Sequence, residues 1–83
     1  MSHKPHDLAV EFPDDLDLLH RLKTKGHFSA LADRYKEVNH VIMRIEAQLE
    51  AASDMRVEEL KRERLALLDR LGAVIREARR TPA

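Results

Sequence analysis

One run of apolar residues constrains the fold of this 83-residue chain more than any other feature. Its members recur at alternating spacings of three and four residues. That spacing is the heptad period of an α-helix that packs along its length on one partner helix. The members are Phe28, Leu31, Tyr35, Val38, Ile42, Ile45 and Leu49. The pattern predicts a long helix over residues 28–50.

A second heptad, over residues 54–79, supplies the partner helix. Its seam positions are Val57, Leu60, Arg64, Leu67, Leu71, Val74 and Ala78. Ser53 and Asp54 are both suited to cap the start of this helix. Because the connection is short, the two helices form an antiparallel hairpin. We expect Leu60, Leu67, Leu71 and Val74 to face Leu31, Tyr35, Val38, Ile42, Ile45 and Leu49 across the hairpin seam.

Arg64 is the charged residue in this seam. In one interpretation its long side chain reaches the rim and keeps its charge in water. In the other it pairs with Glu46 or Glu50 across the hairpin and fixes the register of the two helices. The sequence favours neither.

The helix over 54–79 carries a second apolar stripe beside its seam, formed by Leu65, Leu68, Gly72 and Ile75. Two stripes are wider than one partner helix covers. A short N-terminal helix, a second copy of the chain or a helix of another protein would have to cover the rest. Burying its three Leu and Ile side chains at ~2 kcal/mol each contributes ~6 kcal/mol before entropy. We therefore expect a homo-oligomer with Leu65, Leu68 and Ile75 at its interface, or an unidentified protein partner on the same stripe.

The first third of the chain predicts one short helix over residues 14–25. Pro13 suits a first helical turn, and Gly26 suits the left-handed position after a helix end. A single turn is expected at 7–11. Residues 1–6 are expected to be a disordered tail, 7–79 a single helical domain and 80–83 a frayed end. No stretch alternates with period two, so the fold class is all-α.

Several functional classes are disfavoured by composition. The absence of cysteine excludes disulfides and thiolate metal sites. No apolar stretch approaches the ~20 residues of a membrane span, and no secretory signal is present, so we expect a cytoplasmic protein. The histidines do not share a helix face at metal-ligand spacing, and Ser29 and Ser53 suit helix caps. We expect no enzyme, no metal and no cofactor.

Nucleic-acid binding by the helix over residues 54–79 is the alternative function. Its basic residues are concentrated at Lys61, Arg62, Arg64, Arg70, Arg76, Arg79 and Arg80. Acidic residues interleave with them, and no aromatic residue is available to stack on bases. The whole chain has fifteen basic and fifteen acidic residues, so it has no bulk attraction to polyanions. A solvated helix face is therefore the expected role of these charges.

Ordered sequence blocks over about residues 7–76 resemble the YdcH-like family of small bacterial proteins of unknown function. The blocks are Glu11-Phe12-Pro13, Leu22-Lys23, Phe28 with Leu31 and Tyr35, Arg44-Ile45-Glu46, and the run from Glu59 to Asp69. Leu68 departs from the family pattern, which usually has Lys there, and widens the apolar face. The resemblance implies a coiled-coil hairpin that acts in interactions or structure, with no catalytic residue or cofactor to carry over.

Overall fold

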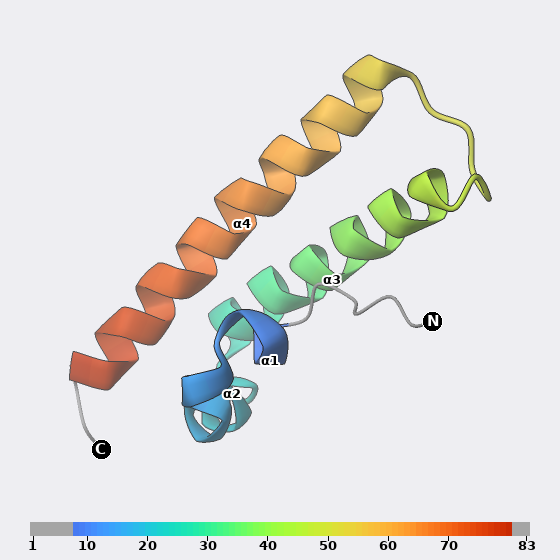
Figure 1. Ribbon diagram of the computed structural model, residues 1–83. Helices are drawn as coiled ribbons and strands as arrows, with labels where there is room; N and C mark the ends of the chain where they lie inside the picture. The colour runs from blue at the N-terminus through green and yellow to red at the C-terminus, as the bar shows by residue number, and fades with distance from the viewer. Residues whose placement is uncertain (1–7, 81–83) are drawn as a thin grey trace.

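The computed structural model describes residues 8–80, and Figure 1 shows that this part of the chain is built from helices. In chain order they are α1 (Leu8–Glu11), the 3-10 turn η1 (Pro13–Asp15), α2 (Leu16–Leu22), α3 (Gly26–Glu46) and α4 (Asp54–Arg80). No strand is assigned between residues 8 and 80. The all-α prediction is therefore confirmed. The predicted tail, Asp7 and the last three residues lie outside the described residues.

Helices α3 and α4 run antiparallel and pack along the predicted hairpin seam (Figure 1). The buried seam residues are Leu31, Tyr35, Val38 and Ile42 from α3 and Leu60, Leu67 and Leu71 from α4. Ile45 and Val74 are half-buried and pack against this core. The hairpin forms because both helices concentrate apolar residues on one narrow face.

Helix α3 ends at Glu46, four residues before the predicted end. Gln48 then adopts a left-handed conformation with φ 62°. Its N–H donates to the carbonyl of Ile45 at 3.0 Å, and the N–H of Leu49 donates to the carbonyl of Arg44 at 2.8 Å. These two bonds are a Schellman motif, which satisfies the last carbonyls of a helix. Leu49 is consequently 68% exposed, so its predicted place in the seam is wrong.

The other helix ends agree with the predictions only in part. Helix α4 begins at Asp54, and the N–H of Arg56 donates to Oγ of Ser53 at 3.1 Å, which confirms Ser53 as a cap. Ser29 lies inside α3, where its N–H donates to the carbonyl of Lys25, so its predicted capping role is wrong. Gly26 begins α3 without a positive φ, and the predicted helix over 14–25 is divided into η1 and α2.

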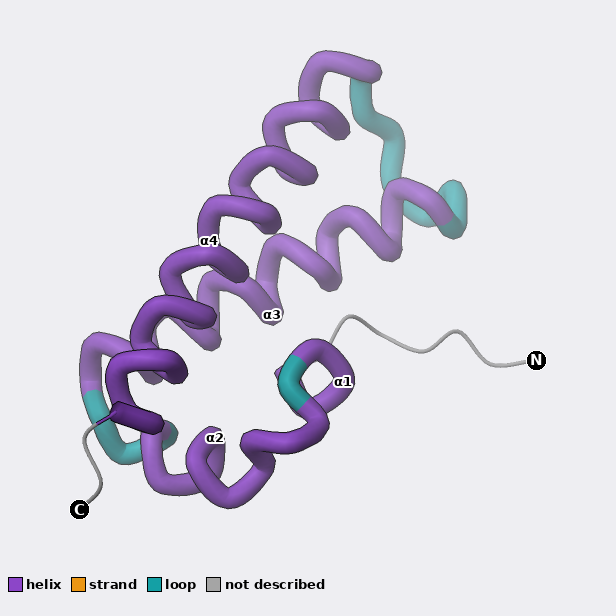
Figure 2. The backbone as a smooth tube through the Cα atoms, turned by 60° about the vertical axis from the view of Figure 1, so that its left-hand side comes forward, coloured by secondary structure: helices purple, strands orange, loops and turns teal. Residues whose placement is uncertain are grey.

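The segment α1–η1–α2, here called the N-terminal arm, folds against the hairpin (Figures 1 and 2). Leu19 and Leu22 of α2 are buried in the same apolar cluster as Leu71 and Ile75 of α4. Ile75 is 0% exposed, so the prediction that it belongs to an intermolecular face is wrong for this fold. The N-terminal arm covers this end of the second stripe.

Gly72 marks a point where the N-terminal arm lies against α4. Gly72 is buried, and a Cβ placed on it would lie 3.7 Å from Cζ of Phe12. This is an ordinary van der Waals distance, so a methyl group at this position would contact the ring without a clash. The arm is also tied to the last turn of α4, where the guanidinium of Arg79 donates two hydrogen bonds to the carboxylate of Asp15.

Candidate interaction surfaces

The outer strip of α4, formed by Leu65 and Leu68, is one candidate surface. Leu65 is 61% exposed, whereas Leu68 is half-buried and packs partly against the core. The two side chains are three residues apart and share one face of the helix. The structure therefore leaves two of the three predicted interface residues accessible, and it buries the third, Ile75, under the N-terminal arm.

Charges are arranged symmetrically about Leu65 on this face. Lys61 and Asp69 lie four residues before and after it, and Asp54 and Arg76 lie eleven residues before and after it. Steps of four and eleven both return close to the same side of an α-helix. All four charged residues are exposed. In these two pairs, a basic residue therefore stands at the position that mirrors an acidic one, whereas Glu58, seven residues before Leu65, is mirrored by Gly72.

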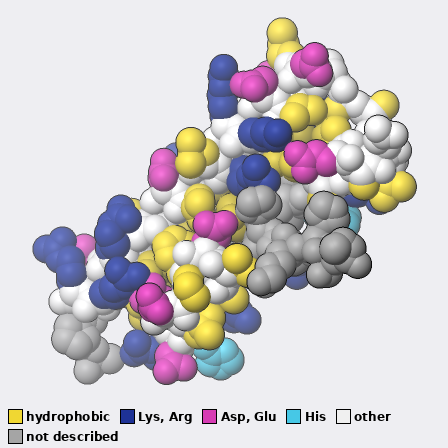
Figure 3. Space-filling view, viewed as in Figure 1, with side chains coloured by type: hydrophobic (Ala, Val, Ile, Leu, Met, Phe, Trp, Pro, Cys, Tyr) yellow, Lys and Arg dark blue, Asp and Glu magenta, His cyan; other side chains and the backbone are white. Residues whose placement is uncertain are grey.

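The basic residues of α4 do not form a continuous positive surface. Figure 3 shows Lys and Arg side chains along α4 interspersed with acidic and hydrophobic ones. Many of these cations have an acidic partner: Lys61 pairs with Glu46 at 3.5 Å, Arg62 with Glu58 at 3.9 Å and Arg80 with Glu77 at 3.8 Å. This arrangement matches a solvated helix face, and no specific feature of it favours nucleic acid.

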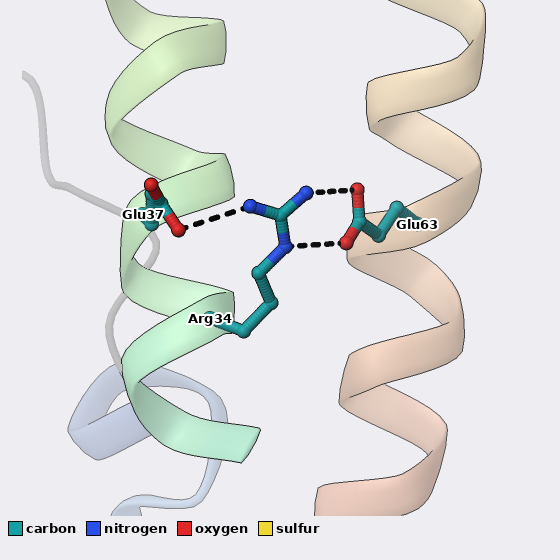
Figure 4. Close-up of polar contacts among 3 residues, drawn as sticks. All are labelled: Arg34, Glu37 and Glu63. Atoms are coloured by element: carbon teal, nitrogen blue, oxygen red, sulfur yellow. Dashed lines mark hydrogen bonds and ion pairs between the residues drawn. The ribbon is translucent and has the colours of Figure 1, made fainter. Parts of the chain in front are cut away.

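The main ion pair across the hairpin joins Arg34 of α3 to Glu63 of α4 (Figure 4). Nε and Nη2 of Arg34 donate to the two carboxylate oxygens of Glu63 at 2.5 and 2.9 Å, and Nη1 donates to Glu37 at 2.9 Å. These hydrogen bonds from Arg34 lower the pKa of Glu63, and they raise the pKa of Arg34. The two-point geometry fixes how the helices align along the hairpin.

Arg64 does not make the ion pair that one interpretation of the sequence proposed. It is half-buried, and its Nη1 donates to Oδ1 of Asn39 at 3.4 Å. Glu46 pairs with Lys61, and Glu50 pairs with Arg44 at 3.3 Å. The pairing prediction is therefore wrong. Arg34 could not be found from the charges at seam positions, because it reaches Glu63 from beside the seam.

The second candidate surface is a groove of about 900 Å³ between the N-terminal arm and α3, closed on one side by Arg64 of α4. Its apolar lining includes Leu8, Ala9, Leu16, Leu19, Phe28, Ala32, Tyr35, Ile42 and Met43. Its polar lining comprises Ser29, Asn39, His20, Lys23, Lys36, His40, Arg64, Asp33 and Glu46. The sequence analysis did not find this groove, because it exists only once the N-terminal arm lies beside α3.

The described part of the chain provides no metal site or membrane span. Among residues 8–80, no three or more His, Cys, Asp or Glu side chains are grouped so that they could hold a metal ion. In the same residues, no helix is both long enough and apolar enough to cross a membrane. The two apolar surfaces are therefore the features of the described structure that call for a functional explanation.

Comparison with known proteins gives a family but no activity. No curated protein and no solved structure matches the chain. A family model described as "Protein of unknown function (DUF465)" matches residues 28–75, which comprise α3 and most of α4. The description does not include the YdcH-like name, so that resemblance stays a prediction. Since the match extends over more than half of the sequence and follows the hairpin seam, the chain belongs to the DUF465 family of proteins of unknown function.

Proposed function

We propose that this protein is a non-catalytic interaction protein whose helical hairpin self-associates through the outer strip of α4. The observation that carries the proposal is the 61% exposure of Leu65 in the middle of a 27-residue helix. A large aliphatic side chain held there by a long, regular helix is available to a second helix. The cytoplasmic location expected from the sequence belongs to the same proposal, which includes no metal or cofactor.

The charges around Leu65 support a two-fold symmetric, antiparallel pair of α4 helices. If Leu65 lies on the symmetry axis, each residue faces the one at the mirrored position of the other copy. Lys61 then faces Asp69, and Asp54 faces Arg76. Opposite charges meet at both positions, so one sequence is complementary to itself in this register.

The buried area supports a weak dimer. Two leucines from each copy contribute at most ~8 kcal/mol at ~2 kcal/mol per side chain. Leu68 is already half-buried, so the gain is smaller, and association itself costs ~4 kcal/mol or more. At most about 4 kcal/mol remains, which corresponds to a dissociation constant that is roughly millimolar or weaker. A helix of another protein could bind the same strip. The experiment below distinguishes this partner from a second copy of the chain.

The test is light scattering behind a sizing column over a hundredfold range of concentration that reaches about 1 mM. The mass should rise from that of the 9.6 kDa chain toward twice that value. Leu65→Lys places two lysines on the axis and should keep the chain monomeric. Ala66→Lys adds the same charge at an exposed neighbouring position and should leave the dimer intact. A wild-type chain that stays monomeric at every concentration would refute self-association and leave the strip to a different protein.

A charge swap tests the antiparallel register itself. Lys61→Asp places two acidic residues opposite each other at both symmetric positions and should weaken the dimer. Adding Asp69→Lys to the same chain restores opposite charges and should recover it. If the double variant is as weak as the single one, Lys61 and Asp69 do not face each other, and the register is wrong.

A further inference from the structure

The groove between the N-terminal arm and α3 is elongated, and its length would accommodate a helix. Its lining extends along α3 from Phe28 to Glu46. At 1.5 Å per residue this is about 27 Å, or about five helical turns. Leu8 and Leu16 of the N-terminal arm line it as well, and Arg64 of α4 closes it. Grooves of this form bind amphipathic helices by their apolar face.

The groove leaves apolar surface open to solvent. Its floor includes Phe28, Tyr35 and Ile42, which are 1–2% exposed and belong to the core. Above them, Leu16 is 53% exposed and Met43 is 44% exposed. These are two of the six large apolar side chains that the described residues expose. Methionine adapts its shape to different partners, so Met43 suits a recognition surface.

The charge around this apolar surface is predominantly basic. The lining contains Lys23, Lys36 and Arg64 together with two histidines, whereas its acidic residues are Asp33 and Glu46. The carboxylate of Glu46 is already paired with Lys61, which lies beside the groove, at 3.5 Å. The lining therefore has one more basic than acidic residue, and one of its two carboxylates is already paired, whereas the chain as a whole is neutral.

From these observations we propose that the groove binds an amphipathic helix of another protein that carries acidic residues beside its apolar stripe. Two copies of this chain that placed their grooves together would bring two surfaces with the same excess of basic residues against each other, which is unfavourable. Nucleic acid fits less well, because the aromatic rings of Phe28 and Tyr35 are buried and offer no face for stacking. An acidic helix satisfies both the apolar floor and the basic rim.

This site is independent of the proposed self-association, because neither Leu65 nor Leu68 lines the groove. Two fluorescein-labelled helical peptides of eighteen residues serve as probes. Both carry leucine at spacings of three and four, and the remaining positions are mostly glutamate in one and mostly lysine in the other. Fluorescence anisotropy with the full chain should show saturable binding of the glutamate peptide and at least tenfold weaker binding of the lysine peptide.

Matched variants locate the binding site. Lys36→Glu reverses a charge in the groove and should weaken binding at least tenfold, whereas Arg70→Glu makes the same change on an exposed residue of α4 and should change it less than twofold. Met43→Asp should likewise weaken binding, and Met55→Asp, at an exposed methionine outside the groove, should not. Circular dichroism checks that each variant keeps its helix content.

Three results would overturn the proposal. The first is equal affinity for the glutamate and lysine peptides. The second is that Lys36→Glu and Arg70→Glu weaken binding equally, which would indicate only general charge attraction. The third is loss of peptide binding in Leu65→Lys, which would place the peptide on the outer strip of α4. A Leu65→Lys chain that is monomeric and still binds the glutamate peptide separates the groove from self-association.

Discussion

Replacing Gln48 with glycine should stabilise the protein, although the sequence pattern predicts the opposite. Gln48 is the non-glycine residue with positive φ among residues 8–80, at 62°. A side chain in the left-handed region costs about 1–2 kcal/mol, because its Cβ crowds the backbone. Glycine removes that cost, and it adds about 0.5–1 kcal/mol of unfolded-state entropy. The net expectation for Gln48→Gly is stabilisation by about 0.5–1 kcal/mol.

A thermal melt followed by helical circular dichroism measures this effect. In a domain of this size, 1 kcal/mol shifts Tm by about 4–8 °C, so Gln48→Gly should raise Tm by about 2–8 °C. Ala52→Gly is the matched control, because it introduces glycine in the same connection at a residue without positive φ. It should lower Tm by a few degrees.

The sign of the change in Tm distinguishes a helix α3 that ends at Glu46 from one that continues to residue 50. If α3 continued to residue 50, as the heptad predicts, Gln48 would lie inside a helix. Glycine there costs about 1 kcal/mol, and Tm would fall by about 4–8 °C. A fall as large as that of Ala52→Gly would therefore refute the Schellman ending of α3 and the exposed position of Leu49 that depends on it.

Three further predictions concern the core and its ion pairs. Gly72→Ala should raise Tm, because alanine gains about 1 kcal/mol of helix propensity and its Cβ would meet the Phe12 ring at an ordinary 3.7 Å; a fall in the melt would contradict this. Leu71→Ala should lower the free energy of unfolding in urea by about 2–5 kcal/mol, because Leu71 is 0% exposed. Leu65→Ala in dilute solution should lower it by less than about 0.5 kcal/mol. Equal losses would contradict the assigned core. Glu63→Gln removes a carboxylate whose pKa is lowered in the folded state, so the carboxylate stabilises the fold above its unfolded pKa of about 4.3, and this stabilisation is lost as the pH falls through the folded pKa. The difference in Tm between the variant and the wild type should therefore be present at pH 7 and shrink below about pH 4. A difference that stays constant with pH would contradict the ion pair.

The hairpin could be predicted from the sequence because the spacing of apolar residues that specifies it repeats along each helix. Each turn of α3 and α4 presents an apolar residue at the same angle, so an error at one position does not change the packing face. The end of α3 is different. Residues 47–52 contain no glycine or proline, and nothing in their helix propensity stops the helix at Glu46. The chain ends α3 there because it must reverse direction before Ser53 caps α4, which is a tertiary requirement.

The candidate surfaces depended more on tertiary structure than the hairpin did. The exposure of Leu65 follows from its angle on α4, about one-third of a turn from the seam, and could be predicted. Ile75 occupies the same predicted stripe, yet it is buried, in an apolar cluster to which the N-terminal arm contributes Leu19 and Leu22. The groove beside α3 could not be predicted, since no residue pattern specifies where a short arm docks.

The boundary of the family match gives this arrangement a physical meaning. The matched residues, 28–75, contain both heptad helices but not the N-terminal arm, which lies before them. A hairpin alone would expose the whole second stripe of α4, from Leu65 to Ile75. Here the N-terminal arm covers the Ile75 end and stops before Leu65, which stays open. The length and docking position of the arm therefore set how much of α4 is available to another helix, and the same arm forms one side of the groove on α3. One short segment thus determines the extent of both candidate surfaces.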